Sequence, residues 1–106
     1  MPNLKKPKVL HFTTHSRAKM RQYGLSENRV KRVMHTPKRI EEGIAPKTVA
    51  MMQRAGSMKR PYEIWIMISD KADKRNIVSA WRYPGITKPG EPLPEAILKE
   101  MRTISI

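Results

Sequence analysis

Cysteine is absent from this sequence, and acidic and aromatic side chains are scarce. The 106 residues contain no Cys, 9 Asp or Glu and one Phe. Without thiols the chain can form neither a disulfide nor a thiolate metal site, and a cytoplasmic location is the expectation. The longest apolar run, residues 64–68, is much too short to cross a bilayer. No apolar stretch of signal-peptide length follows the basic first residues, so we expect neither a membrane segment nor a cleaved signal.

Positive charge is what the sequence has in excess. It contains 22 Lys or Arg, its formal net charge is +13, and its pI is about 10.5. Residues 1–60 hold 15 Lys or Arg against 3 Asp or Glu, whereas residues 61–106 hold 7 against 6. Such a balance favours a polyanionic partner, with nucleic acid foremost. We therefore expect the partner-binding surface to lie in the first half of the chain.

Turn formers and apolar spacing predict two N-terminal helices followed by a sheet. The first helix should be capped by Thr13 or Thr14 and end near Gly24, and the second should begin after Ser26 and end before Pro37. Branched and aromatic residues then predict three or four antiparallel strands, and a short strand could precede the helices. The segments with strand character are residues 8–12, 39–46, 47–53, 62–69 and 76–83.

The end of the chain is predicted to differ from the rest. Residues 84–106 should form a proline-rich linker and a C-terminal helix, with Leu93, Ile97 and Met101 on its apolar stripe. A chain of 106 residues has room for one modest core, so residues 1–106 are treated as a single domain. The predicted fold is α+β, with two N-terminal helices packed on a three- to four-stranded antiparallel sheet, plus the C-terminal helix.

The first predicted helix carries several candidate functional side chains. The side of this helix that carries Met20 should pack on the sheet. His15 and Lys19, four residues apart, lie at one border of that face, while Arg17 and Arg21 lie on the other side. Helix and sheet can form a cleft at such a border. The alternative is that His15 only packs near the helix start and that Lys19 is a solvated flank.

Several kinds of site lack their motifs. The sequence has no glycine-rich phosphate loop and no metalloprotease His-Glu pair, and His11, His15 and His35 have few acidic neighbours, so no metal or other cofactor is expected. Ser16 and Ser79 lie in no nucleophile-elbow context. What remains are guanidinium and ammonium groups, which bind phosphate and stabilise phosphoryl-transfer transition states.

Two segments resemble a known group of proteins. "HSRAKMRQYGLSENRVKRVMHTP", residues 15–37, resembles the N-terminal signature of a small, largely uncharacterised bacterial domain family related to the RelE-like and BrnT-like ribonuclease toxins. "NIVSAWRY", residues 76–83, is similar to the closing strand of these proteins. The resemblance covers residues 9–83. Ser16, Lys19 and Tyr23 depart from it, since the family has alanine at the first of these positions and arginine at the other two.

The resemblance implies a microbial-ribonuclease-like fold and metal-independent cleavage of RNA, often messenger RNA, by a toxin held in check by an antitoxin protein. In such chemistry the RNA 2′-hydroxyl attacks its own phosphate, one group takes a proton, another supplies one, and cations surround the phosphate. The residues expected to be catalytic are His15, Lys19, Arg82 and Tyr83. The residues expected to bind nucleic acid are Arg17, Arg21, Arg39 and Arg75.

Strand alternation adds detail to these assignments. Trp81 and Tyr83 should share one face of their strand, with Arg82 on the other, and Trp65 and Trp81 are expected in the core. Two other functions stay open: a basic nucleic-acid-binding module without catalysis, or an interaction domain that docks a partner protein through the C-terminal apolar stripe.

Overall fold

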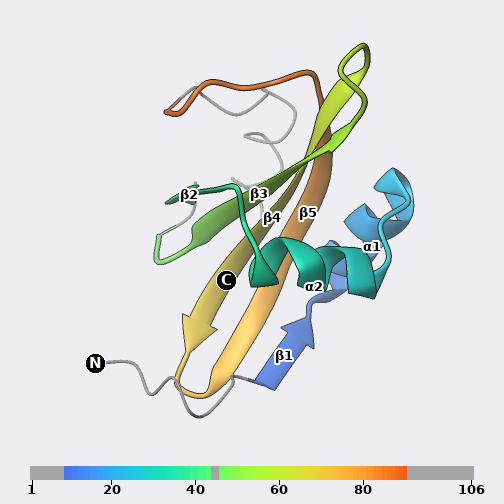
Figure 1. Cartoon of the computed structure of the whole chain (residues 1–106). Helices are drawn as coiled ribbons and strands as arrows, with labels where there is room; N and C mark the ends of the chain where they lie inside the picture. The colour runs from blue at the N-terminus through green and yellow to red at the C-terminus, as the bar shows by residue number, and fades with distance from the viewer. Residues whose placement is uncertain (1–8, 44–45, 91–106) are drawn as a thin grey trace.

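The computed structural model describes residues 9–43 and 46–90, which form two helices and a five-stranded sheet (Figure 1). The elements are β1 (Val9–Phe12), α1 (Thr14–Tyr23), α2 (Glu27–His35), β2 (Arg39–Glu42), β3 (Val49–Gly56), β4 (Pro61–Lys71) and β5 (Lys74–Pro84). The expected α+β class is confirmed. The C-terminal helix expected around Leu93, Ile97 and Met101 lies outside the described residues. Neither described helix is long and apolar enough to cross a membrane.

The sheet is mixed rather than purely antiparallel, and this corrects the expectation. Its strand order is β1-β5-β4-β3-β2. Strands β2 to β5 form an antiparallel meander, whereas β1 runs parallel to β5 and places Phe12 opposite Ile77. The segment at residues 39–42 also pairs, as an edge strand, which brings the number of strands to five. Sequence patterns do not show the parallel pairing because they are local, and β5, the partner of β1, is the last described strand along the sequence.

Local signals set the helix ends as expected. The Thr13 side chain caps α1, and Gly24 ends that helix with a φ of 67°, a left-handed conformation that suits glycine. The Ser26 side chain caps α2. That helix ends two residues before Pro37, whose ring disfavours helical backbone in the preceding residue.

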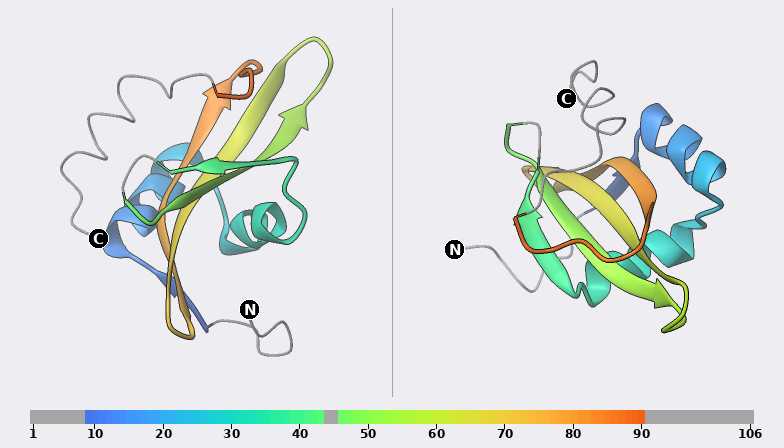
Figure 2. Two further views of the ribbon diagram at one scale, coloured as in Figure 1. Left: turned by 90° about the vertical axis from the view of Figure 1, so that its left-hand side faces the viewer. Right: turned by 90° about the horizontal axis from the view of Figure 1, so that it is seen from above.

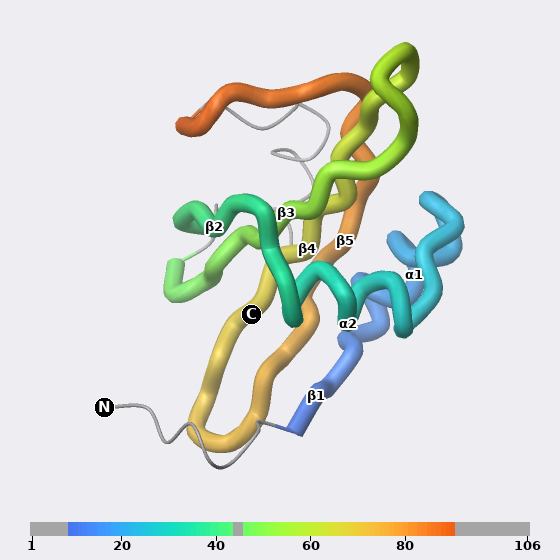
Figure 3. The backbone as a smooth tube through the Cα atoms, viewed as in Figure 1, coloured from blue at the N-terminus to red at the C-terminus, as the bar shows by residue number. Residues whose placement is uncertain are grey.

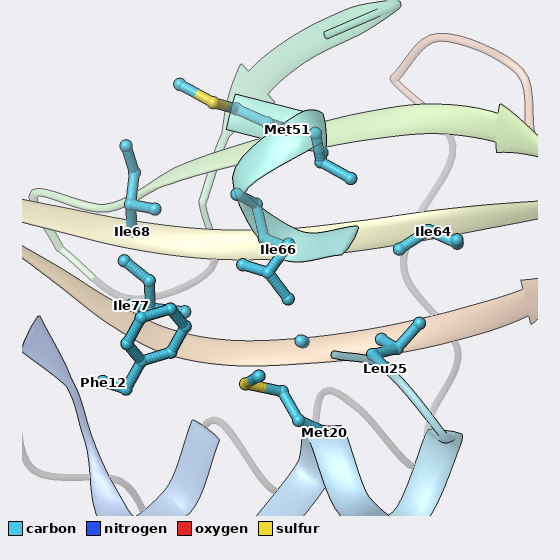
Figure 4. Close-up of a cluster of buried hydrophobic side chains, with 11 residues drawn as sticks. Phe12, Met20, Leu25, Met51, Ile64, Ile66, Ile68 and Ile77 are labelled. Atoms are coloured by element: carbon cyan, nitrogen blue, oxygen red, sulfur yellow. The ribbon is translucent and has the colours of Figure 1, made fainter. Parts of the chain in front are cut away.

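Both helices pack on one face of the sheet (Figure 2), with α1 beside β5 and α2 across β3 and β4. Their apolar side chains meet every second side chain of the strands, because neighbouring strand residues point to opposite faces. The resulting core (Figure 4) consists of Phe12, Met20, Leu25, Val30, Val33, Met51, Ile64, Ile66, Ile68, Ile77 and Ala80. Each large aliphatic side chain buried there contributes about 1.5–3 kcal/mol, so this core fixes the helices on the sheet.

The opposite face of the sheet carries a second apolar cluster built on two tryptophans. Trp65 and Trp81 are opposite each other in the β4–β5 register, and their rings stack with centroids 5.8 Å apart. Each is 1% exposed, and Met52 and Met67 pack with them. Both tryptophans are therefore core residues, as expected. Tyr83 packs against the same cluster, on the face that strand alternation predicts.

Candidate nucleic-acid interface

Three arginine side chains lie on the side of the sheet that the helices cover. Arg29 and Arg32 belong to α2, and Arg82 belongs to β5. Burial lowers the pKa of Arg29, and the positive charges of Arg32 and Arg82 lower it further, so both of these guanidinium groups lie within electrostatic reach of Arg29. Arg32 and Arg82 are exposed and Arg29 is half-buried. We call these three residues the arginine cluster.

No carboxylate neutralises the arginine cluster within residues 9–43 and 46–90. Three carboxylates in this part of the chain pair with other arginines: Glu27 with Arg17, Glu41 with Arg39 and Asp70 with Arg75. Like charges held together without a counter-charge raise the free energy of the folded protein, and a bound anion removes that repulsion. The arrangement is therefore suited to binding an anion.

A glutamine on β3 holds Arg29 in place. Gln53 Oε1 accepts a hydrogen bond from Arg29 Nη1, while Gln53 Nε2 donates to the carbonyl oxygens of Arg32 at 3.0 Å and Thr36 at 2.9 Å. These bonds join α2 to the sheet, and the buried valines of the helix anchor its other side in the core. A guanidinium that is already positioned loses less conformational entropy when it binds a ligand.

A phenol lies beside the arginine cluster. The guanidinium carbon of Arg82 is 4.9 Å from the centre of the Tyr62 ring, which is within cation–π range. The β4–β5 register places Arg82 opposite Ile64, and Tyr62 is two residues from Ile64, so all three point to the helix-covered side. The interaction of Tyr62 with Arg29 acts against the lowering of the Arg29 pKa. The phenol is thus close to both Arg29 and Arg82.

The structure does not bring together the four residues expected to be catalytic. The Thr13 hydroxyl, which lies two residues before His15 at the start of α1, donates to the Val78 carbonyl oxygen of β5 at 3.3 Å. Arg82 is four residues farther along the strand, about 13 Å away at the rise of a β-strand. Tyr83 packs on the tryptophan face, opposite Arg82. Arg82 and Tyr83 therefore lie on opposite faces of β5, and the start of α1, which carries His15, is bonded to an earlier part of that strand.

Lys19, the fourth of these residues, is more buried than a flank position suggests. It is 8% exposed. Its Nζ donates to Gln22 Oε1 at 2.9 Å and lies 6.0 Å from the centre of the Tyr23 ring. Tyr23 itself packs against both apolar clusters. Lys19 therefore lies on the inner side of α1, close to the edge of the core.

Three of the residues expected to bind nucleic acid lie at the surface. Arg17 is 3.6 Å from the Glu27 carboxylate, and Arg21 is exposed in the last turn of α1. Arg75 donates two hydrogen bonds to the Asp70 carboxylate, at 2.8 and 2.9 Å, which raise the pKa of Arg75. Arg21 therefore keeps its charge available to a ligand, whereas Arg75 already has a carboxylate partner.

Arg39, the fourth, makes its contacts within the protein. Its Nη1 and Nη2 donate to the carbonyl and hydroxyl oxygens of Thr87, each at 2.8 Å, and its Nε lies 2.8 Å from the Glu41 carboxylate. The guanidinium also lies over the Trp65 ring, 5.2 Å from its centre. These contacts use the donors that a phosphate would need, so they favour a structural role for Arg39.

A buried carboxylate, that of Glu63, also binds Thr87. Glu63 of β4 is fully buried and accepts hydrogen bonds from Trp65 Nε1 at 2.9 Å, from the Thr87 backbone N–H at 3.0 Å and from the Thr87 hydroxyl at 2.7 Å. Thr87 belongs to residues 85–90, which we call the strap and which run from the end of β5 toward β2 (Figure 1). Arg39 and Glu63 thus hold the strap to two strands of the sheet.

Sequence patterns did not single out four residues at this site: Arg29, Arg32, Gln53 and Tyr62. Arg29 and Arg32 carried a signal, since they are three residues apart and share one side of a predicted helix. Tyr62 and Arg82 become neighbours only through the register of β4 and β5. The contact of Gln53 with α2 depends on how the helix packs, and no local pattern indicates it.

Comparisons with known proteins give no match. No family model matches the chain, and neither a curated protein nor a solved structure matches it. Within residues 9–43 and 46–90, no three His, Asp or Glu side chains are grouped so that they could hold a metal ion.

Proposed function

We propose that this chain binds RNA and that the arginine cluster holds RNA phosphates. One observation carries the proposal: the guanidinium groups of Arg32 and Arg82 both lie within electrostatic reach of Arg29, and no carboxylate of the described chain pairs with the three. Guanidinium groups bind phosphate oxygens in bidentate fashion. The excess of Lys and Arg in residues 1–60 adds long-range attraction for the same partner. The resemblance to RNA-cleaving toxins supports RNA rather than DNA.

A pair of double variants tests this proposal. Arg32→Gln with Arg82→Gln removes two exposed charges of the arginine cluster, while Lys71→Gln with Lys74→Gln removes two exposed charges at the β4–β5 turn, the other end of the hairpin. Each single-strand phosphate contact contributes about 0.7 to the slope of log K against log salt. The arginine variant should therefore bind single-stranded RNA with a slope smaller by about 1 to 1.5, and the lysine variant should behave as the parent.

Two results would contradict the proposal. Equal losses in the two double variants would show that total charge drives binding and would remove the arginine cluster as the site. A parent protein that does not bind RNA even at low salt would reject the function itself. Thermal unfolding of both variants serves as the control for folding.

A second candidate function is cleavage of the bound RNA, and the position of Tyr62 favours it. Its phenol lies beside Arg82 and close to Arg29, so a hydroxyl able to give a proton to the leaving oxygen would stand next to cations able to stabilise the phosphate's added charge. We propose this activity as an extension of RNA binding. The antitoxin partner that the resemblance implies stays a prediction.

Removal of the Tyr62 hydroxyl tests this second function. Tyr62→Phe keeps the ring under Arg82 and should lower the cleavage of end-labelled RNA by about a hundredfold, with RNA affinity unchanged. The assay is run with and without a chelator. Undiminished cleavage in Tyr62→Phe would exclude the phenol as the proton donor. RNA left intact by the parent protein would reject cleavage and leave RNA binding in place.

A further inference from the structure

The loop between β3 and β4, residues 57–60, carries a fully exposed apolar side chain. Met58 is 100% exposed, more than any other large apolar residue of the described chain. Lys59 and Arg60 follow it, and both are exposed. The hairpin that bears this loop extends beyond both helices (Figure 3). The tip of the hairpin therefore presents a methionine flanked by two cations.

The shape of the tip does not depend on Met58. Gly56 adopts a φ of +80°, and a Cβ there would lie 2.3 Å from the Arg60 carbonyl oxygen, so the position requires glycine. The Ser57 backbone N–H donates to the Arg60 carbonyl oxygen at 3.4 Å, and the Arg60 N–H donates to Ser57 Oγ at 3.1 Å. Backbone and serine contacts thus close the loop, and the methionine side chain is left for contact with a partner.

The tip of the hairpin is close enough to the arginine cluster for one RNA strand to contact both. Gln53, which bonds Arg29, is four residues before Ser57, which corresponds to about 13 Å along β3. Arg54, the next residue after Gln53, is exposed but is opposite Glu63 in the β3–β4 register, so it lies on the tryptophan side of the sheet. Four residues of strand thus separate the arginine cluster from the tip, a span that a few nucleotides of one RNA strand cover.

We propose that the hairpin tip contacts the bases of the bound RNA, with Met58 inserted between two neighbouring bases and Lys59 and Arg60 on the flanking phosphates. The proposal rests on the proposed RNA binding. Apolar side chains such as methionine act as wedges between base steps in other nucleic-acid complexes, and the unbranched, polarizable thioether adapts to aromatic surfaces. Insertion separates stacked bases, so the favoured substrate is unpaired or weakly stacked RNA.

Base unstacking can be measured directly. Single-stranded RNA containing 2-aminopurine, whose fluorescence rises when it is unstacked, is titrated with the parent, with Met58→Ser and with Ile40→Ser. Ile40 is the matched control, because it is 58% exposed on the edge strand β2, away from the tip. The parent and Ile40→Ser should raise the fluorescence. Met58→Ser should lose this rise and bind about two- to tenfold more weakly, with the salt dependence kept.

Each alternative outcome has one meaning. A fluorescence rise in Met58→Ser equal to that of the parent overturns the wedge and leaves RNA binding by the arginine cluster in place. A parent that binds no RNA overturns both proposals. Met58-dependent binding to anionic phospholipid vesicles, without unstacking of RNA, also overturns the wedge and assigns the tip to a membrane surface.

Discussion

Replacing the buried Glu63 by glutamine tests how the strap is held. The carboxylate accepts three hydrogen bonds, two at Oε1 from Trp65 and the Thr87 hydroxyl and one at Oε2 from the Thr87 N–H. A glutamine offers an oxygen and an NH2 group. In its better orientation the oxygen keeps the first two bonds, and the NH2 group then faces the Thr87 N–H, so that two donors meet.

The size of the effect follows from this count. A buried donor left without an acceptor costs about 1–3 kcal/mol, and the two remaining bonds lose the added strength that a charged acceptor gives. We expect Glu63→Gln to lower the free energy of unfolding by about 2–3 kcal/mol. In a domain of roughly 100 residues this corresponds to a Tm lower by roughly 10–20 °C.

Thermal unfolding followed by far-UV circular dichroism measures this change. Glu42→Gln is the control, since Glu42 is an exposed carboxylate on β2 and its loss should change stability by less than about 0.5 kcal/mol. Equal Tm values for Glu63→Gln and Glu42→Gln would refute the reasoning, because they would mean that the buried carboxylate is not needed to hold the strap.

Three further changes are predicted. Gln53→Ala should weaken RNA binding about three- to tenfold in fluorescence anisotropy, because Arg29 loses its hydrogen-bond partner; an unchanged affinity would show that Arg29 needs no support. Gly24→Ala should cost about 1 kcal/mol in urea unfolding, since φ is 67° there, and an equally stable variant would contradict the need for glycine. If His15 is the acid or base of RNA cleavage, His15→Ala should lower the cleavage rate about a hundredfold and keep the RNA affinity within a few-fold of the parent. Cleavage at the parental rate would exclude His15 as the acid or base.

Features set by neighbouring residues could be predicted from the sequence. The caps at Thr13 and Ser26 and the helix end at Gly24 follow from side chains and backbone preferences within one turn of chain. Strand alternation likewise placed Arg82 and Tyr83 on opposite faces of β5, as the structure shows. These signals need no knowledge of the rest of the fold.

Features that join distant segments could not be predicted in the same way. The arginine cluster needs α2 packed on β3 and the β4–β5 register in place, and single-sequence periodicity contains neither. Arg39 illustrates the same limit. Its charge indicated that it binds phosphate, whereas its place on β2, opposite Met52 of β3, brings its guanidinium to Thr87 of the strap. The sequence shows that an arginine is charged but not which group it contacts in the folded protein.

The parallel pairing of β1 with β5 has a consequence for biosynthesis. Phe12 and the start of α1 contact Ile77 and Val78, so the N-terminal segment must wait for the last described strand to be made. At ordinary translation rates of about 5–20 residues per second, the 65 residues from Phe12 to Ile77 take roughly 3 to 13 s. During this time the apolar side of α1, with Met20, has no sheet to cover it. The chain therefore completes its fold late, with both ends of the described sequence assembled together, and its nascent form is the one most exposed to aggregation or chaperone binding.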